Sequence, residues 1–208
     1  MLWFLLVGCA GSDGTDDGGS LVGSLSVDGY DVDIEIVKAY GYDNGGEGVF
    51  DFPSNPEATC DDVVDLMNNY SVGKSEKIEP DEVVAGNSCR LFLNANLEDG
   101  EGTFSGSGGD PSIDAFWTLD CPLGDGAFEW ENRDGDKDYY WSGDRYAGNP
   151  VDWTTTIEAE DEGYRLDVEM NGFTGNYIDV LAELPGDGSV TGSIFVTPCG
   201  GMADSPWL

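Results

Sequence analysis

Short runs of alternating apolar and polar residues extend along most of the chain. Apolar and acidic residues alternate over 30–36, and an Asp-Gly pair at 28–29 separates this run from a second alternating run over 24–27. An Asp-Gly pair supplies the positive φ angles of a two-residue hairpin turn, and alternation with a period of two is typical of a half-buried strand. The pattern therefore predicts a β-hairpin in which Val27 lies opposite Tyr30.

Similar runs follow through the rest of the chain, and a Pro-Gly-Asp-Gly turn is expected between the last two. They cover residues 91–97, 113–119, 153–159, 166–170, 178–184 and 190–196. About eight short strands in antiparallel hairpins, each with one apolar and one polar face, are typical of two packed sheets. We therefore predict an all-β fold, an antiparallel β-sandwich or jelly-roll-like domain, that forms a single domain over residues 24–208.

One segment has a different spacing. Over 59–70 the large apolar residues recur every three or four positions, as they do on one face of a helix. Thr59 is a suitable N-cap, and Asp61 and Asp62 fall in the first turn, where carboxylates interact favourably with the helix dipole. We expect one short helix that covers a face or an end of the sheet.

The N-terminus is apolar and ends in a cysteine. Residues 1–7 are apolar, and Leu-Val-Gly-Cys at 6–9 matches a bacterial lipobox. This pattern predicts a signal peptide over 1–8, cleavage before Cys9 and attachment of a lipid to the Cys9 thiol. No basic residue precedes the apolar run, as expected where the recorded start lies after the natural one. An apolar N-terminus packed on the domain is the alternative.

The segment after Cys9 has the composition of a tether. Residues 9–23 are rich in Gly, Ser, Asp and Thr, and Leu21 and Val22 are their only large apolar side chains. Such a segment buries too little surface to offset the entropy of ordering it. We predict a flexible acidic linker over 9–23.

Residues 6–9 and this linker resemble those of bacterial lipoproteins as a class. The alternating run over 192–197, which leads into Pro198 and Cys199, is similar to the last strand of β-rich myxobacterial lipoproteins of uncharacterised function. The resemblance implies a membrane-anchored envelope protein and no particular activity. Because Ala10 and not an aspartate follows the lipobox cysteine, it implies the outer membrane or cell surface.

The charge of the chain is extreme. There are 42 acidic residues and 8 basic ones, the net charge is −34, and histidine is absent. Such a chain repels nucleic acid, so no nucleic-acid partner is expected. A solvated surface, adaptation to a saline habitat and cation binding are all consistent with it. The aromatic content of 12% and the strand patterns indicate a packed core and not a disordered acidic chain.

Four cysteines remain once Cys9 is assigned to the lipid. An even number in an exported chain predicts two disulfides, for which three pairings exist. We favour the pairs Cys60–Cys89 and Cys121–Cys199, because the first would tie the helix to the next strand and the second would join two strand ends. A zinc site is the alternative, and the lack of CxxC and of histidine argues against it.

An acidic stretch offers a candidate calcium site. Asp134, Asp136 and Asp138 alternate with other residues, and Asp144 follows. Carboxylates two residues apart in a loop can converge on a hard cation. The EF-hand pattern is not met, because Tyr139 stands where its glycine belongs. A calcium site and a solvated acidic turn stay open as alternatives, and no other cofactor is expected.

Residues 110–153 are rich in aromatic side chains. Exposed Trp and Tyr side chains commonly have partners, and they can stack on the apolar faces of sugar rings. Three consecutive aromatic residues cannot all face the core from one strand. Core packing is the alternative, and we expect it above all for the tryptophans. The candidate ligand-binding residues are Trp130, Tyr139, Tyr140, Trp141 and Tyr146.

The chain carries no catalytic motif. The absence of histidine excludes Ser-His-Asp triads and Cys-His dyads, and no phosphate-binding GxxxxGK[ST] loop is present. A glycosidase pair of carboxylates cannot be singled out among so many acidic residues. We therefore expect no enzyme, but a membrane-anchored envelope or surface protein with a binding or structural role. A carbohydrate-binding module, with or without calcium, is the first alternative, and a glycoside-active enzyme is the second.

Overall fold

Nearly all of the described chain is β-structure. The computed structural model describes residues 18–204 except 28, 44–45, 72–87, 98–99, 108–113, 124–128, 133–138, 143–144 and 178–179. The first half contains β1 (Gly19–Val27), β2 (Tyr30–Ile36), β3 (Tyr40–Asp43), β4 (Glu47–Pro53), α1 (Cys60–Ser71), β5 (Arg90–Asn96) and β6 (Gly102–Ser107). The second half contains β7 (Ala115–Pro122), β8 (Glu129–Asn132), β9 (Tyr139–Ser142), β10 (Arg145–Glu160), β11 (Gly163–Tyr177), β12 (Val180–Pro198) and the 3-10 helix η1 (Gly200–Asp204). The all-β class with one short helix is confirmed.

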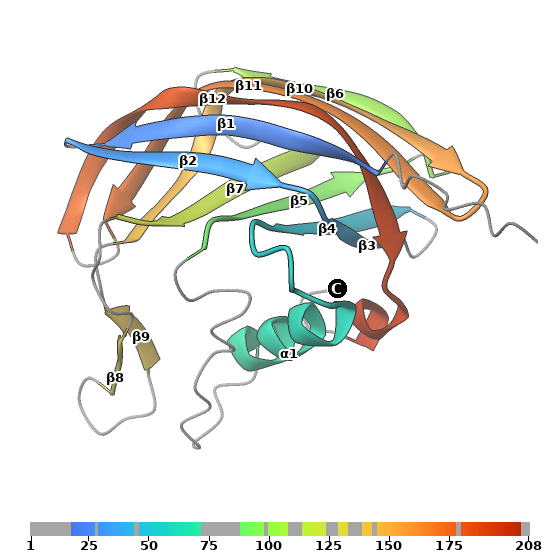
Figure 1. The fold of residues 1–208 in the computed structure, drawn as a ribbon, viewed down its shortest axis with the longest axis horizontal. Helices are drawn as coiled ribbons and strands as arrows, with labels where there is room; N and C mark the ends of the chain where they lie inside the picture. The colour runs from blue at the N-terminus through green and yellow to red at the C-terminus, as the bar shows by residue number, and fades with distance from the viewer. Residues whose placement is uncertain are drawn as a thin grey trace, which may run out of the picture.

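The main sheet closes on itself, so the predicted sandwich or jelly roll is wrong. Ten strands form one sheet, and seven of them follow each other around a closed β-barrel in the order β11-β10-β7-β5-β4-β3-β12 and back to β11. Hairpin β1–β2 extends the sheet from β12, on the side where β12 also pairs with β3, and β6 lies beside β10 (Figure 1). Alternation shows that each strand has one buried face. It does not show whether the buried faces belong to two sheets or to one curved sheet.

Three long strands make this closure possible. β10, β11 and β12 have 16, 15 and 19 residues, where the sequence pattern indicated shorter ones. The turn expected at 185–188 is absent, because β12 runs through it. A Cβ at Gly186 would come within 3.1 Å of the Tyr146 hydroxyl, so glycine there leaves room for a core tyrosine and does not reverse the chain. On β11 the register shifts at Gly172, whose φ of 66° is left-handed, and such a bulge bends a strand.

The barrel closes through a narrow seam between β3 and β12. The two strands run parallel and pair only at Thr197 with Tyr40 and at Pro198 with Gly41. The amide of Thr197 donates to the Ala39 carbonyl at 2.9 Å, and the amide of Cys199 donates to the Gly41 carbonyl at 2.7 Å. Further back along the same side, β12 pairs with β1. The side of β12 that closes the barrel is thus shared by two strands from the N-terminal part of the chain.

The predicted N-terminal hairpin is confirmed, and it starts earlier than expected. β1 and β2 pair with Val27 opposite Tyr30, as the Asp-Gly turn indicates. β1 begins at Gly19, so residues 19–23 belong to the main sheet and the expected linker up to 23 is too long. Leu21 is fully buried, and it continues the inward-facing alternation of the strand. The glycines around it gave this stretch the composition of a linker.

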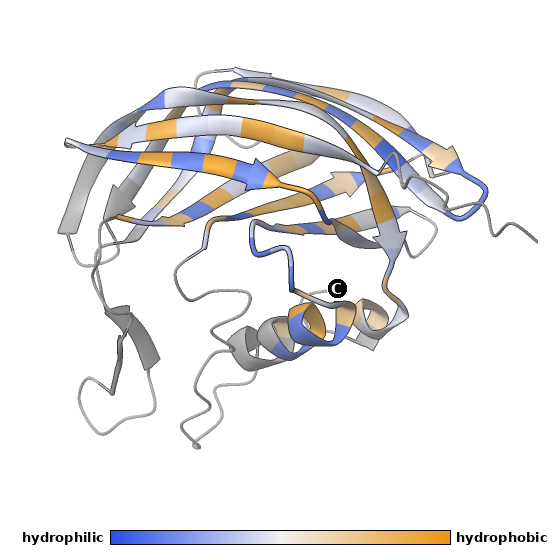
Figure 2. Ribbon diagram, in the orientation of Figure 1, coloured by the Kyte–Doolittle hydropathy of each residue, from blue (hydrophilic) through white to orange (hydrophobic). Residues whose placement is uncertain are grey.

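Side chains fill the interior of the barrel. The largest fully buried ones include Trp117, Tyr146, Phe50, Phe52 and Phe173. The rings of Phe52 and Trp117 lie 5.1 Å apart, and the Trp117 indole donates to the buried hydroxyl of Thr155 at 2.9 Å. Figure 2 shows hydrophobic and hydrophilic positions alternating along the strands, as expected when one face of each strand lines this core.

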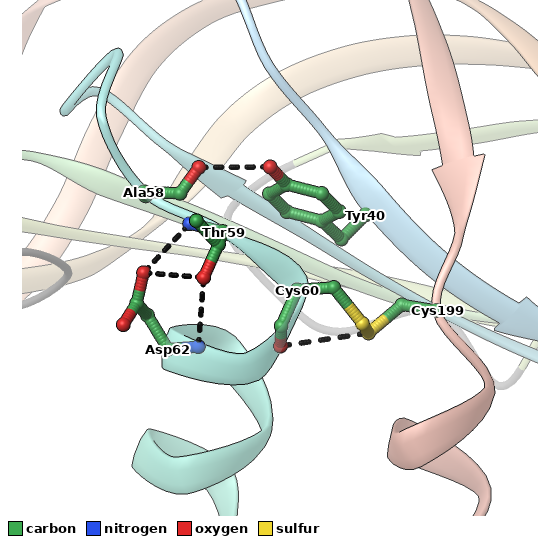
Figure 3. Close-up of a disulfide and its surroundings, with 6 residues drawn as sticks. All are labelled: Tyr40, Ala58, Thr59, Cys60, Asp62 and Cys199. Carbon is green, nitrogen blue, oxygen red and sulfur yellow. Dashed lines mark hydrogen bonds between the residues drawn. A yellow bond between two sulfur atoms is a disulfide. The ribbon is translucent and has the colours of Figure 1, made fainter.

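Helix α1 packs on the outer face of the barrel, at β3 and β4. A second apolar cluster there contains Val49, Val63, Met67 and Met202. The Thr59 hydroxyl accepts a hydrogen bond from the Asp62 amide at 3.3 Å, and the Asp62 carboxylate accepts one from the Thr59 amide at 2.8 Å (Figure 3). Thr59 is therefore the N-cap, as predicted.

Both disulfides differ from the favoured pairing. Cys60 bonds to Cys199, which ties the start of α1 to the end of β12 (Figure 3), and Cys89 bonds to Cys121, which ties the start of β5 to the end of β7. The reason is topological, because β5 and β7 are antiparallel neighbours whose register brings residues 89 and 121 together. The prediction of two disulfides from these four cysteines is confirmed, and the pairs Cys60–Cys89 and Cys121–Cys199 are wrong.

Candidate functional site

Strands β8 and β9 form an aromatic hairpin outside the barrel. They make a two-stranded sheet of their own, inserted between β7 and β10 (Figure 1). The register places Trp130 opposite Trp141 and Asn132 opposite Tyr139. Because successive residues alternate between the two faces of a strand, these four positions fall on one face. Glu131 and Tyr140, which are also opposite each other, fall on the other face.

The register separates candidates that the sequence grouped together. Of three consecutive aromatic residues, Tyr139 and Trp141 share a face with Trp130, and Tyr140 does not. A face with three aromatic positions and one amide is suited to a flat ligand with an apolar side and hydroxyls at its rim. The sequence could not indicate Trp130 as their neighbour, because the pairing depends on where the intervening turn falls.

Tyr146 is not part of this hairpin, although the sequence placed it among the candidate ligand-binding residues. It lies on β10 with no exposed surface, inside the barrel core. Burial raises the pKa of Tyr146 to about 12, and a hydrogen bond with the backbone of Gly186 opposes that shift. Trp117 and Trp153 are also buried, as we expected for tryptophans on strands. Tyr146 therefore belongs to the core and not to an exposed ligand site.

The candidate calcium ligands lie outside the described residues. These are Asp134, Asp136, Asp138 and Asp144. Across the part of the chain that the structure describes, no three Asp, Glu or Cys side chains are close enough together to hold a metal ion. Cys9, the predicted lipid attachment site, also lies outside the described residues.

A second surface feature lies along β2. The carboxylates of Asp33 and Glu35 line a groove of about 380 Å³ together with Val37, and the opposite wall is formed by Ser54 and Pro56 of the loop between β4 and α1. Asp33 and Glu35 are exposed, so their charge acts on whatever approaches the groove. This groove could not be predicted from the sequence, because its shape depends on where the loop after β4 packs.

The loop that forms the far wall is fixed at both ends. The Ser54 amide donates to the Cys89 carbonyl at 2.9 Å. The Ala58 carbonyl accepts hydrogen bonds from the Tyr40 hydroxyl at 2.8 Å and from Lys38 Nζ at 3.3 Å. Burial, and secondly the carboxylate of Asp62, raise the pKa of Tyr40. The groove is therefore preformed.

A buried ion pair joins the neighbouring strands β4 and β5. Asp51 on β4 is fully buried, and Arg90 on β5 donates to it through Nε at 2.8 and 3.0 Å and also through Nη2. The guanidinium also lies 5.8 Å from the centre of the Phe92 ring. Asp51 interrupts a run of apolar residues in β4, and this was the one sequence signal that could have indicated a buried charge. Because the two buried charges compensate each other, we interpret the pair as structural.

Comparison of the chain with protein families, with curated proteins and with solved structures finds no match. Within the described residues, no helix has the length and apolar character needed to cross a membrane.

Proposed function

We propose that this chain is a lipid-anchored protein of the bacterial outer membrane or cell surface, whose barrel serves in binding or structure. The observation that carries the proposal is the pair of disulfides, Cys60–Cys199 and Cys89–Cys121. Disulfides persist in oxidising compartments and are rare in the cytosol. They support export independently of the lipobox at Cys9, which supplies the anchor.

The filled barrel favours a role at the outer surface. Barrels that carry small ligands keep an internal cavity, whereas the described part of this interior holds the large side chains of Trp117, Tyr146 and Phe173. Contacts with a partner are therefore expected on the exterior.

The anchor is tested by Cys9→Ser in the native host. Wild-type protein should incorporate radiolabelled palmitate. It is expected in the membrane fraction, because the attached acyl chains bury methylene groups in the bilayer. The Cys9→Ser variant should move to the soluble fraction without label, and Ser12→Ala is the matched control in the same segment. Retention of Cys9→Ser in the membrane would refute the lipid anchor.

Carbohydrate binding through β8–β9 is the second candidate. The register that brings Trp130, Tyr139 and Trp141 to one face supports it. On a glycan array, each of Trp130→Ala and Trp141→Ala should weaken binding about tenfold, which corresponds to the loss of one aromatic contact. Tyr140→Ala, on the other face, is the matched control and should bind as the wild type does.

The array also tests the calcium-assisted form of this proposal. Loss of binding in EDTA, with recovery on adding calcium, would support ligands among Asp134, Asp136, Asp138 and Asp144. Binding that is unchanged by EDTA would support carbohydrate binding by the aromatic face and would refute the need for calcium. If no glycan binds under either condition, the carbohydrate proposal fails and the anchored protein remains.

A further inference from the structure

β2 is an edge strand with a free side. It pairs with β1 over its whole length, and among the described residues it pairs with no other strand. A two-residue turn joins Val27 and Tyr30 as a hydrogen-bonded pair, and such pairs alternate along an antiparallel ladder. Asp31, Asp33 and Glu35 therefore direct their backbone N–H and C=O groups away from β1, towards the free side.

The two faces of β2 differ in chemistry. Ile34 and Ile36 are buried in the barrel core, while Asp31, Asp33 and Glu35 are exposed on the outer face. In an added antiparallel strand, residues opposite the three acidic positions would share the outer face, and the residues between them would face the core side. A strand that completes this edge would therefore alternate basic with apolar residues.

Exposed apolar side chains lie along the same hairpin. Val22 on β1, opposite Glu35, is 47% exposed, and Val37, directly after β2, is 42% exposed. Tyr30 at the start of β2 is exposed as well, so three of the four exposed large hydrophobic residues in the described chain lie on this hairpin or next to it. The alkyl parts of lysine or arginine side chains can cover such residues while their charged ends reach the carboxylates.

The groove lies beside the free side of this strand. Asp33, Glu35 and Val37 line it on the β2 side, and Ser54 and Pro56 line it on the loop side. Its walls are preformed, so a bound segment would be ordered without rearranging the protein. An extended peptide laid along β2 would have its end enclosed there.

Charge argues against a second copy of this chain in that position. Two β2 edges would bring Asp31, Asp33 and Glu35 of one copy opposite the same carboxylates of the other, and like charges on an edge oppose pairing. With 8 basic residues against 42 acidic ones, the chain has no alternating basic run of its own. The occupant is a different molecule with the opposite charge.

We propose that the free side of β2 binds an extended polypeptide segment that alternates Lys or Arg with apolar residues, as an added β-strand. Main-chain hydrogen bonds to Asp31, Asp33 and Glu35 would supply affinity, and the carboxylates would select the basic pattern. Binding at the β2 edge requires neither the lipid anchor nor the aromatic hairpin.

The test measures fluorescence anisotropy with two labelled heptapeptides at ~0.15 M salt, where distant surface charges are screened. One peptide alternates lysine and valine, and the other has the same composition with the lysines grouped together. The alternating peptide is expected to bind at least about tenfold more tightly, because only it can pair with both faces of β2. Equal binding of the two peptides would overturn the proposal.

A matched pair of charge variants separates the edge from the general negative field. Asp33→Asn/Glu35→Gln changes β2, and Asp167→Asn/Glu169→Gln makes the same change on β11, where both sides of the strand are paired. All four side chains are exposed. The β2 variant should lose the preference for the alternating peptide, and the β11 variant should retain it. Equal weakening in both would show a bulk charge effect and refute the edge site.

A backbone variant tests the added strand itself. Asp33→Pro removes an N–H that points to the free side, so the ladder with β1 keeps its hydrogen bonds, and proline is tolerated on an edge in this orientation. The variant should bind neither peptide specifically while keeping the wild-type melting temperature. Specific binding by a folded Asp33→Pro would refute strand addition, and if that variant does not fold, the charge pair decides.

Discussion

Removing each disulfide separately would show how much each stabilises the barrel. The perturbations are the double variants Cys60→Ala/Cys199→Ala and Cys89→Ala/Cys121→Ala. The first disulfide spans 139 residues along the chain and the second spans 32. In the chain-entropy treatment, a crosslink destabilises the unfolded state by an amount that rises with the logarithm of the loop length.

That treatment gives about 5 kcal/mol for the 139-residue loop and about 3.7 kcal/mol for the 32-residue loop. Cys89, Cys121 and Cys199 are buried and Cys60 is half-buried, so the two variants differ in the sulfur packing that they lose only through Cys60. We therefore expect the Cys60/Cys199 variant to lose about 1 kcal/mol more free energy of unfolding than the Cys89/Cys121 variant. Each loss is a large part of the stability of a typical domain.

Urea unfolding followed by tryptophan fluorescence measures both losses, with the wild type as reference. Peptide mapping under non-reducing conditions checks the connectivity on the same samples. A larger loss in the Cys89/Cys121 variant would refute the loop-length argument. A peptide that links Cys60 to Cys89 would refute the fold itself, because α1 would then be tied to β5 and not to the end of β12.

Three further outcomes are expected. Asp51→Ala removes the buried carboxylate to which the Arg90 guanidinium, 12% exposed, donates, and it should lower the free energy of unfolding by about 3–5 kcal/mol. Asp51→Leu/Arg90→Met should recover most of that loss in urea titrations, and an equal loss in both variants would contradict the ion-pair account. The pKa of Tyr146 is raised from 10.0 to about 12 in the folded protein, so between these pH values only the unfolded state loses the phenol proton. The free energy of unfolding should therefore fall from pH 10 to 12 less steeply in Tyr146→Phe than in the wild type. Parallel plots of this free energy against pH would argue against a buried phenol. The net charge of −34 predicts that the melting temperature rises with salt concentration, because salt screens the repulsion between carboxylates. Circular dichroism measures this temperature, and a melting temperature that does not change with salt would mean that self-repulsion is unimportant.

The structure confirms the predictions that depend on short-range sequence patterns. The Asp-Gly pair predicted the register of Val27 against Tyr30, because the turn type determines which residues pair. The capping signal at Thr59 predicted the start of α1, since it depends only on residues within one turn. Alternation also indicated the buried face of most strands. These properties depend on neighbours a few residues away.

Properties that depend on distant contacts were not predictable. The linker composition of residues 19–23 hid the start of β1, which is stabilised by pairing with β12 near the other end of the chain. The Pro-Gly-Asp-Gly sequence at 185–188 resembles a turn, although its glycine accommodates the hydroxyl of Tyr146 from another strand. The same limitation affected the disulfide pairs and the groove at β2. For the aromatic hairpin, the sequence indicated the residue types but not which of them share a face.

The position of β12 also has a consequence for the timing of folding. This last strand pairs with β1 and β3 from the beginning of the chain and with β11 next to it, so the ring stays open until β12 has joined the sheet. Pairings between the two ends of a chain are slow to form, and until then β1, β3 and β11 present unpaired edges. Until β12 has paired, the open strands can associate with strands of other chains. A truncation before residue 187 would remove the β12 residues that pair with β1 and β3, and it would remove Cys199 with them.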